Sequence, residues 1–160
     1  MSAGMEVRGL RELERKLNAL PKTVAKKIVR KAIRSGAAIM RDKAKGNARS
    51  MVGGSMGRLI ARFITVRAYK HQSKGSYSVW MGISPRGGEY FVHTTKRGRR
   101  HYIPSAIEYG HAAPGKAGGA KAVAAIPFQR DAFDTTEARA NSRVVRMIWA
   151  GILREARKPI

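Results

Sequence analysis

The residue types that do acid–base or metal chemistry are few and scattered in this chain of 160 residues. There is no cysteine, which removes thiolate catalysis, disulfides and cysteine metal sites together. None of the histidines has a second ligand at a metal-binding spacing such as His-Glu-x-x-His. The histidines are His71, His93, His101 and His111. Asp131 and Asp134 are close together, but they fall in the first turn of a predicted helix, where capping explains them. The sequence therefore predicts no catalytic residue, no metal site, no cofactor and no enzymatic activity.

One segment nearly matches a phosphate-binding loop. Gly110 to Ala117 fits the pattern G-x-x-x-x-G-K-[ST] except at its last position. Ala117 stands where that loop needs a hydroxyl to hold Mg²⁺. Gly118 and Gly119 then occupy the place where a helix should begin and present its dipole to the phosphate. Nucleotide binding is therefore not expected here.

The charge of the chain is strongly positive. Lys and Arg number 33 against 10 Asp and Glu, which gives a net charge of +23. A field of this sign attracts nucleic acid or an acidic protein surface. No apolar run reaches the length of about 18 residues that a membrane span needs, and Met1 to Gly4 lack a signal-peptide pattern. We therefore expect no membrane partner, and synthesis and use in the cytoplasm.

The positive charges are concentrated in two places. The first is one face of a predicted helix, opposite its apolar stripe, and comprises Lys27, Arg30, Lys31, Arg34 and Arg41. The second is a dense patch in a predicted loop and comprises Lys96, Arg97, Arg99 and Arg100. The helix face either is solvated or contacts DNA or an acidic neighbour. The loop either is a solvated tip or is an arm that contacts DNA or the next subunit.

Aromatic residues flank the basic loop. Tyr90, Phe91 and Tyr102 could stack on nucleic-acid bases, or they could be sheet or interface residues.

Helical periodicity predicts the helix that carries the first cluster of positive charges. Leu10, Leu13, Leu17 and Leu20 predict a short helix, and Pro21 begins a second one that ends near Asn47. A flexible connection is expected over 50–57. Alternating residues then predict strands at Leu59–Ala68 and Tyr77–Ile83, joined by a hairpin loop over 70–76.

The second half of the chain is predicted to hold the remaining strands and one long helix. Tyr102–Tyr109 is a predicted third strand, and a fourth could lie within 88–96. The segment 111–125, rich in Ala and Gly, is predicted to be a flexible loop. After Pro127, the pattern predicts a final helix over Ala132–Ala156.

These elements predict an α+β fold. An antiparallel sheet of three to four strands packs against a long N-terminal helix and a C-terminal helix. Residues 1–160 form a single domain. Its parts are a helical region over 1–49, a sheet over 57–110 that carries the long basic loop 85–101, the flexible loop 111–125 and the helix 127–157.

Several short segments occur in an order that one family shares. Val7-Arg8-Gly9-Leu10-Arg11-Glu12-Leu13 is followed by Leu17-x-x-Leu20-Pro21, a long basic helix and then Gly57-Arg58-Leu59-Ile60. Glu108-Tyr109-Gly110 and Pro127-Phe128-Gln129-Arg130-Asp131-Ala132-Phe133 come later. This order resembles the small head–tail joining and tail-completion proteins in the necks of lambdoid long-tailed phages, the minor tail component type. The loops at 85–101 and 112–124 depart from the pattern of that family.

The resemblance implies a structural virion protein and not an enzyme. It implies a ring subunit, sixfold to match the tail tube, which completes the tail and joins it to the head connector around the DNA channel. Its implied partners are copies of itself, the connector or stopper, and the tail terminator or tail-tube proteins, with non-specific contact to genomic DNA. It would be assembled in the host cytoplasm and reside in the tail or neck of the virion.

The two late motifs supply the predicted subunit interface. Its residues are Glu108, Tyr109, Gly110, Pro127, Phe128 and Arg130. Glu108 is an acid in a very basic chain, and we predict that it pairs with a basic residue, within the subunit or across the ring. Its alternative role is that of a solvent-exposed strand end. The alternative function for the chain is a free basic nucleic-acid-binding protein, which the net charge motivates.

Overall fold

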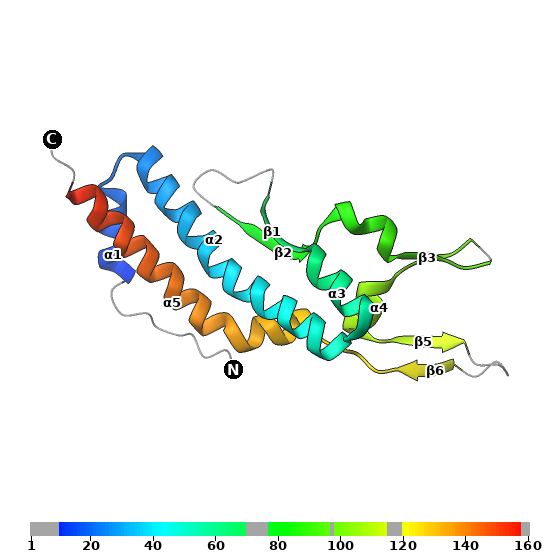
Figure 1. The fold of residues 1–160 in the computed structure, drawn as a ribbon. Coiled ribbons are helices and arrows are strands. Elements are labelled where there is room, and N and C mark those ends of the chain that lie inside the picture. The colour runs from blue at the N-terminus through cyan, green and yellow to red at the C-terminus, as the bar shows by residue number, and fades with distance from the viewer. Residues whose placement is uncertain (1–9, 70–76, 97, 115–119, 158–160) are drawn as a thin grey trace.

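Two long helices, α2 (Lys22–Asn47) and α5 (Phe128–Ala156), run in opposite directions side by side and form the body of the molecule (Figure 1). The computed structural model describes residues 10–69, 77–96, 98–114 and 120–157. Small buried residues, including Ala32 on α2 and Ala140 on α5, let the two backbones approach closely. The short helix α1 (Leu10–Asn18) packs against both. The predicted helices are therefore confirmed.

The chain stays helical after α2. A π-helical turn, Ala48–Val52, leads into helix α3 (Gly54–Phe63). The predicted flexible connection over 50–57 and the predicted strand start at Leu59 are both wrong. Gly57, Ile60 and Ala61 are buried at helical spacing. Gly57 also lies directly against the Ala48 carbonyl oxygen, where any Cβ would clash, so this turn is tightly packed.

Strands β1 (Ile64–Ala68) and β2 (Val79–Ile83) form an antiparallel hairpin that packs on α2. Ile64 faces Ile83 and Val66 faces Met81 in the register. This pairing places apolar residues of both strands on one face of the hairpin. The two predicted strands are confirmed over these shorter ranges. The loop predicted at 70–76 lies outside the described residues.

The core lies where the end of α2, α3, β1 and the start of α5 meet. Its largest buried side chains are Phe91, Phe128, Ile60 and Ile64. Phe63 joins this core to the next segment through an edge-on contact with Phe91, at a distance of 5.7 Å between ring centroids. The segments that follow β2 are therefore attached to the core through aromatic residues.

Residues 85–101, predicted as a long basic loop, form a 3₁₀ helix and then a hairpin. The 3₁₀ helix spans Pro85–Phe91, and Ser84 caps it by accepting the backbone N–H of Arg86 at 3.4 Å. The hairpin consists of β3 (Val92–Thr94) and β4 (Arg100–Tyr102). The predicted fourth strand is therefore present as β3.

The strand predicted over Tyr102–Tyr109 is wrong. These residues form helix α4, Ile103–Tyr109, which Gly110 ends with a φ of 74°. Pro104 lies in the first turn of α4, where a missing N–H costs nothing and the fixed φ suits a helix.

The segment 111–125, predicted to be a flexible loop, contains a third hairpin. Strands β5 (His111–Pro114) and β6 (Ala120–Val123) pair antiparallel. The α+β class is confirmed, but the single sheet of three to four strands is wrong. The strands form separate two-stranded sheets because helical segments interrupt the chain between hairpins. The hairpins β3–β4 and β5–β6 both extend from the same end of the helical body, which we call the hairpin end (Figure 1).

Candidate assembly surfaces

The carboxylate of Glu108 is buried at the start of α5. Its side chain is 2% exposed and comes from the last turn of α4. The backbone N–H groups of Gln129 and Arg130 each donate to a different oxygen of this carboxylate at 2.9 Å. The first N–H groups of a helix have no partner within the helix, and they favour negative charge. Glu108 therefore caps α5 from a separate helix.

The side chain of Arg130 closes the outer side of this cap. Its Nη2 donates to the Glu108 carbonyl oxygen at 2.9 Å, and its Nε lies 3.4 Å from the Glu108 carboxylate. The guanidinium also lies over the Tyr109 ring, 5.0 Å from the centroid. The prediction that Glu108 pairs with a basic residue is confirmed, and the partner belongs to the same chain. The alternative of a solvent-exposed strand end is wrong.

Asn47 ties the end of α2 to the same place, a role that no pattern in the sequence predicts. Its Nδ2 donates to the Phe128 carbonyl oxygen at 3.1 Å and to Asp131 Oδ2 at 2.7 Å. The one signal in the sequence is a polar residue at the end of the basic helix, and this pattern by itself indicates only where the helix ends. Together these contacts lock α2, α4 and α5 to one another.

The base of the β5–β6 hairpin is fixed beside this cap. The Ile126 N–H donates to the Ile107 carbonyl at 2.8 Å. A Cβ on Gly110 would come within 2.6 Å of the Val123 carbonyl oxygen. Only glycine fits both this contact and the positive φ at that position. The hairpin therefore leaves the body in a defined direction.

The structure brings the six predicted interface residues together around the start of α5. Tyr109 and Arg130 are exposed, Gly110 and Pro127 are partly buried, and Glu108 and Phe128 are buried. Whether they form a subunit interface stays a prediction. In such an interface Tyr109 and Arg130 would offer most of the accessible surface.

The β3–β4 hairpin carries its positive charge at an ordered tip. Thr95 accepts the Arg99 N–H at its Oγ1 at 3.1 Å and donates its own N–H to the Arg99 carbonyl at 2.8 Å. Lys96, Arg99 and Arg100 are exposed, and Arg97 lies outside the described residues. The basic patch is therefore on a projecting arm.

The aromatic residues beside this arm are engaged with the core. Phe91 is fully buried, so the suggestion that it could stack on bases is wrong. Tyr90 stacks on Phe63 at 5.7 Å between centroids, and Tyr102 lies edge-on to Phe91 at 6.3 Å. Partial burial raises the pKa of the Tyr102 hydroxyl. Tyr90 and Tyr102 still expose part of their surface.

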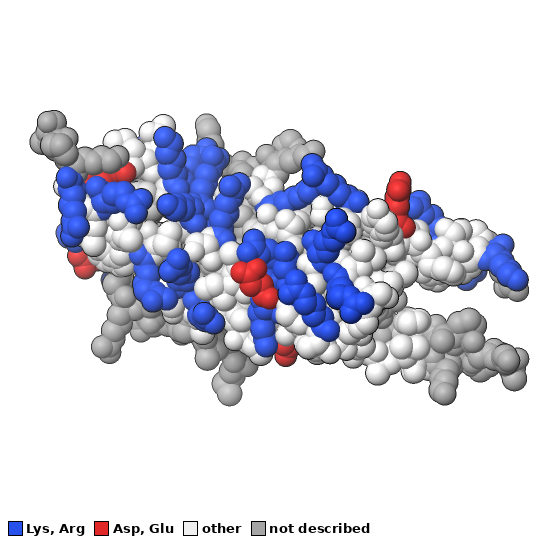
Figure 2. Space-filling model, viewed as in Figure 1, with Lys and Arg blue, Asp and Glu red and all other residues white. Residues whose placement is uncertain are grey.

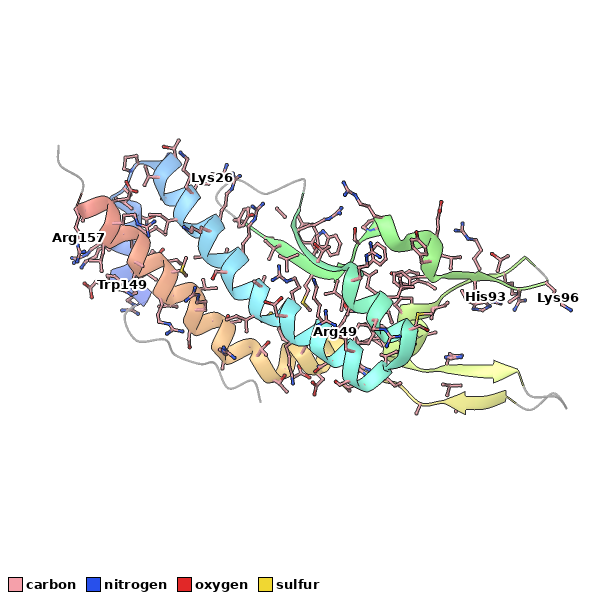
Figure 3. All side chains as sticks on the ribbon, viewed as in Figure 1. Lys26, Arg49, His93, Lys96, Trp149 and Arg157 are labelled. Atoms are coloured by element: carbon pink, nitrogen blue, oxygen red, sulfur yellow. The ribbon has the colours of Figure 1, made fainter. Side chains whose placement is uncertain are left out.

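The basic face of α2 lies on the helical body and not on the arm. Lys27, Arg30, Lys31 and Arg34 are exposed, and Arg41 makes an ion pair with Asp42 at 2.7 Å. Arg30 lies over the Tyr77 ring at 5.3 Å. Figure 2 shows Lys and Arg spread widely over the visible face, with few acids among them. Figure 3 places Lys26, on α2, and Lys96, on the arm, at opposite ends of the molecule.

The histidines and acids do not gather into a site. His93 and His101 face one another across the β3–β4 hairpin, and His111 lies at the start of β5. His71 lies outside the described residues. Over 10–69, 77–96, 98–114 and 120–157, no group of three or more His, Cys, Asp or Glu could hold a metal ion. In the same ranges, no helix is long and apolar enough to cross a membrane.

One protein-family model matches a part of the first half of the chain. Residues 11–84 match the HK97-gp10-like family. Its model is described as "Bacteriophage HK97-gp10, putative tail-component". The match confirms the resemblance over this range and is consistent with a phage neck or tail-completion family. No curated protein and no solved structure matches the chain.

The HK97-gp10-like match covers α1 through β2. A match to a tail-component family points to a structural role in the virion, in contact with other virion proteins. The 3₁₀ helix, the two projecting hairpins and α5 lie beyond the matched range. The motifs at Glu108 and Pro127 also lie beyond it, so their assignment rests on the resemblance.

Proposed function

We propose that the protein is a ring subunit of a tailed-phage neck. In this role it completes the tail and joins it to the head connector around the DNA channel. Its neighbours in a ring of six, which matches a tail tube, are copies of itself. It also contacts connector or stopper proteins and tail-terminator or tail-tube proteins. It is assembled in the host cytoplasm and resides in the neck.

The observation that carries this proposal is the pair of hairpins at one end of the helical body. Each hairpin is a two-stranded sheet, so its outer edges pair with no strand among the residues that the structure describes. Unpaired strand edges are ready to pair with another chain. Because both hairpins lie at one end of the body, the two ends of the subunit differ. Such a subunit suits the heterologous, head-to-tail contacts that close a ring.

The cap at the start of α5 supports the same role. It holds the base of the β5–β6 hairpin, so that the hairpin can meet a neighbour without first being ordered. Tyr109 and Arg130 lie on the outside of this cap and would contact the neighbouring subunit. In that arrangement Glu108 and Phe128 position the interface from inside the subunit.

Native mass spectrometry and electron microscopy of the purified protein, alone and mixed with its connector and tail-tube proteins, test the proposal. We expect a closed ring in at least one of these mixtures. A protein that stays monomeric in all of them, and that is absent from purified particles, would refute it.

A free nucleic-acid-binding protein is the second candidate, and the exposed cations on α2 and on the β3–β4 arm favour it. This function requires tight binding to duplex DNA with a steep dependence on salt. Weak binding at a salt concentration of about 150 mM would exclude it, because a protein that acts by binding nucleic acid must still bind at that salt concentration.

A further inference from the structure

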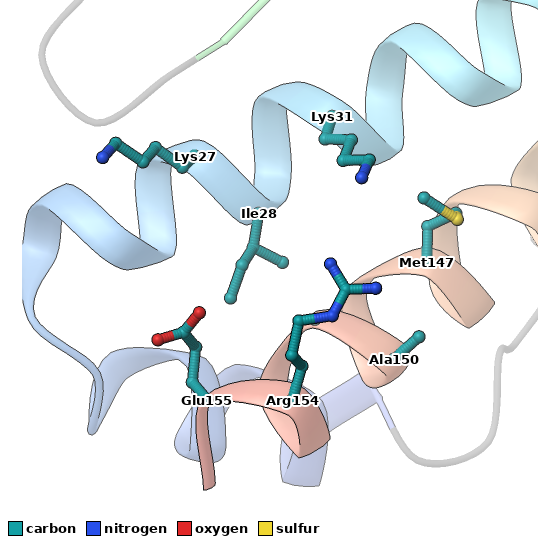
Figure 4. A pocket seen from close by; sticks show the side chains of 8 residues that line it. Lys27, Ile28, Lys31, Met147, Ala150, Arg154 and Glu155 are labelled. Carbon is teal, nitrogen blue, oxygen red and sulfur yellow. The ribbon is translucent and has the colours of Figure 1, made fainter. Parts of the chain in front are cut away.

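A groove between α2 and α5 lies at the end of the body away from the hairpins (Figure 4), and we call this the groove end. Its volume is about 190 Å³. Ile28 from α2 and Met147, Ala150 and Gly151 from α5 form its apolar floor. Ile28 and Gly151 lie in close contact, since a Cβ added to Gly151 would come within 2.6 Å of Ile28 Cγ2.

Three cations and one acid surround this floor. Lys27 and Lys31 lie on the α2 side, and Arg154 and Glu155 lie on the α5 side. In Figure 4, the Arg154 guanidinium extends toward α2 and the Lys31 ammonium turns toward it. Two like charges that converge on one groove repel each other, and a bound anion removes that cost.

The described part of the chain does not supply this anion as an ion pair. The pairs found there join Lys16 to Glu12, Arg41 to Asp42 and Arg130 to Glu108. None involves a cation of the groove. The positive charge at the rim is thus available to a partner.

The size and polarity of the groove define the partner further. An apolar cavity of about 150 Å³ holds a molecule as large as benzene, so this groove has room for one large apolar side chain. A bare phosphate would leave the floor unused. A ligand that joins an apolar side chain to nearby carboxylates would use both the floor and the rim.

We infer that the groove binds an acidic segment of a different protein. The segment inserts one apolar side chain between Ile28 and Met147 and places carboxylates beside Lys31 and Arg154. A second copy of this chain fits poorly, because the arm that it would offer carries Lys96, Arg99 and Arg100. The inference goes beyond the proposed ring and rests on the groove alone.

The test measures binding of short labelled peptides to the full-length protein by fluorescence anisotropy. The probe is a blocked peptide with Leu-Phe between pairs of Glu residues, and the matched peptide has Ala-Ala in their place. We expect the probe to bind about tenfold more tightly than the Ala-Ala peptide, the ratio that 1.4 kcal/mol of apolar burial gives.

A charge-reversed protein tests the rim. Lys31→Glu combined with Arg154→Glu should weaken binding of the probe about tenfold or more, because attraction becomes repulsion. The control is Lys26→Glu combined with Arg157→Glu, which makes the same change of net charge outside the groove (Figure 3). It should weaken binding by less than about threefold, because both side chains are exposed to solvent, which screens them, and neither lines the groove.

Filling the floor of the groove with a larger side chain gives a test that leaves the net charge of the protein unchanged. Ala150→Trp should weaken binding of the probe and leave the circular dichroism spectrum intact, since Ala150 is exposed at the groove. This variant decides the question if the charge-reversed protein fails to fold.

Three results would overturn the inference. The first is a wild-type protein that binds neither peptide, and the second is equal weakening in the groove variant and its control. The third is a duplex oligonucleotide that binds more tightly than the probe and depends on Lys31 and Arg154, which would make the groove a nucleic-acid contact.

Discussion

The hairpin end and the groove end of this molecule differ in whether their charged groups are paired within the chain. At the hairpin end, the buried Glu108 carboxylate meets two backbone N–H groups and the Arg130 side chain. At the groove end, Lys31 and Arg154 converge without an ion pair among the described residues. The first arrangement satisfies its charges internally, and the second leaves them to a partner.

This difference separates two kinds of polar residue. Polar groups that are buried and satisfied hold a structure in place, and their loss should appear in stability. Charged groups that are exposed and unpaired contribute little to stability, and their loss should appear in binding. Substitutions at the two ends therefore test this division.

Removal of the Glu108 carboxylate should cost the most. Glu108→Ala leaves the first N–H groups of α5 and the Arg130 side chain without their acceptor, and we expect a loss of about 3 kcal/mol in the free energy of unfolding. Urea denaturation measures it. Glu108→Gln is the matched control, because it keeps one acceptor oxygen and should lose less. A loss below about 1 kcal/mol, the size typical of any single hydrogen bond, would contradict the role of Glu108 as the anchor of this end.

Removal of the Asn47 amide should have the next largest effect. Asn47→Ala leaves the Phe128 carbonyl and Asp131 without their donor in a buried place, which should cost about 1–2 kcal/mol. The same denaturation experiment measures it. Ser50→Ala is the control, because that hydroxyl bonds only within its own helical turn and is exposed. Equal losses in both variants would mean that Asn47 does not couple α2 to α5.

Arg130→Ala should have a smaller effect, although it touches the same carboxylate. The Arg130 side chain is 51% exposed, so solvent screens its pair with Glu108. We expect a loss of about 0.5–1 kcal/mol. A loss as large as that of Glu108→Ala would show that the guanidinium, and not the backbone cap, holds the start of α5.

Neutralisation at the groove should leave stability almost unchanged. Arg154→Gln removes one of two converging cations, and the free energy of unfolding should change by no more than about 0.5 kcal/mol. Binding of the acidic probe peptide should fall in the same variant. A clear loss of stability would mean that Arg154 has a structural role, and it would break the contrast between the two ends.

The smallest effect concerns an exposed ion pair on α1. Lys16 lies 3.0 Å from Glu12, and its hydrogen bond and positive charge lower the pKa of that carboxyl below its usual value. A lowered pKa gives stability that is present above the unfolded-state pKa and is lost as the pH falls through the folded-state pKa. Titration of Glu12 by NMR should show its pKa rise in Lys16→Met. An unchanged pKa would contradict the assigned cause.

The long helices could be predicted from the sequence because their apolar residues repeat at helical spacing over many turns. Other segments were ambiguous. Ile60 and Ile64 are four residues apart, which suits a helix, yet they also join the alternating pattern of β1. Pro104 fits either a strand edge or a first helical turn, and the neighbouring residues do not decide between them.

The remaining features depend on contacts that no local pattern encodes. The β5–β6 hairpin is made largely of Ala, Gly and Lys, so it has no apolar alternation to reveal it. The charge of Glu108 suggested a basic partner, but its cap requires α4 to meet the start of α5, some 20 positions further along. The groove requires Ile28 and Gly151 to meet, and only the packing of α2 on α5 brings them together.

We propose that this chain is a structural subunit of the phage neck. Electron microscopy of purified particles labelled with an antibody against the protein tests it most directly. We predict that the label is found at the junction between head and tail, on every complete particle. Particles that carry no label and contain none of the protein by mass spectrometry would contradict the claim.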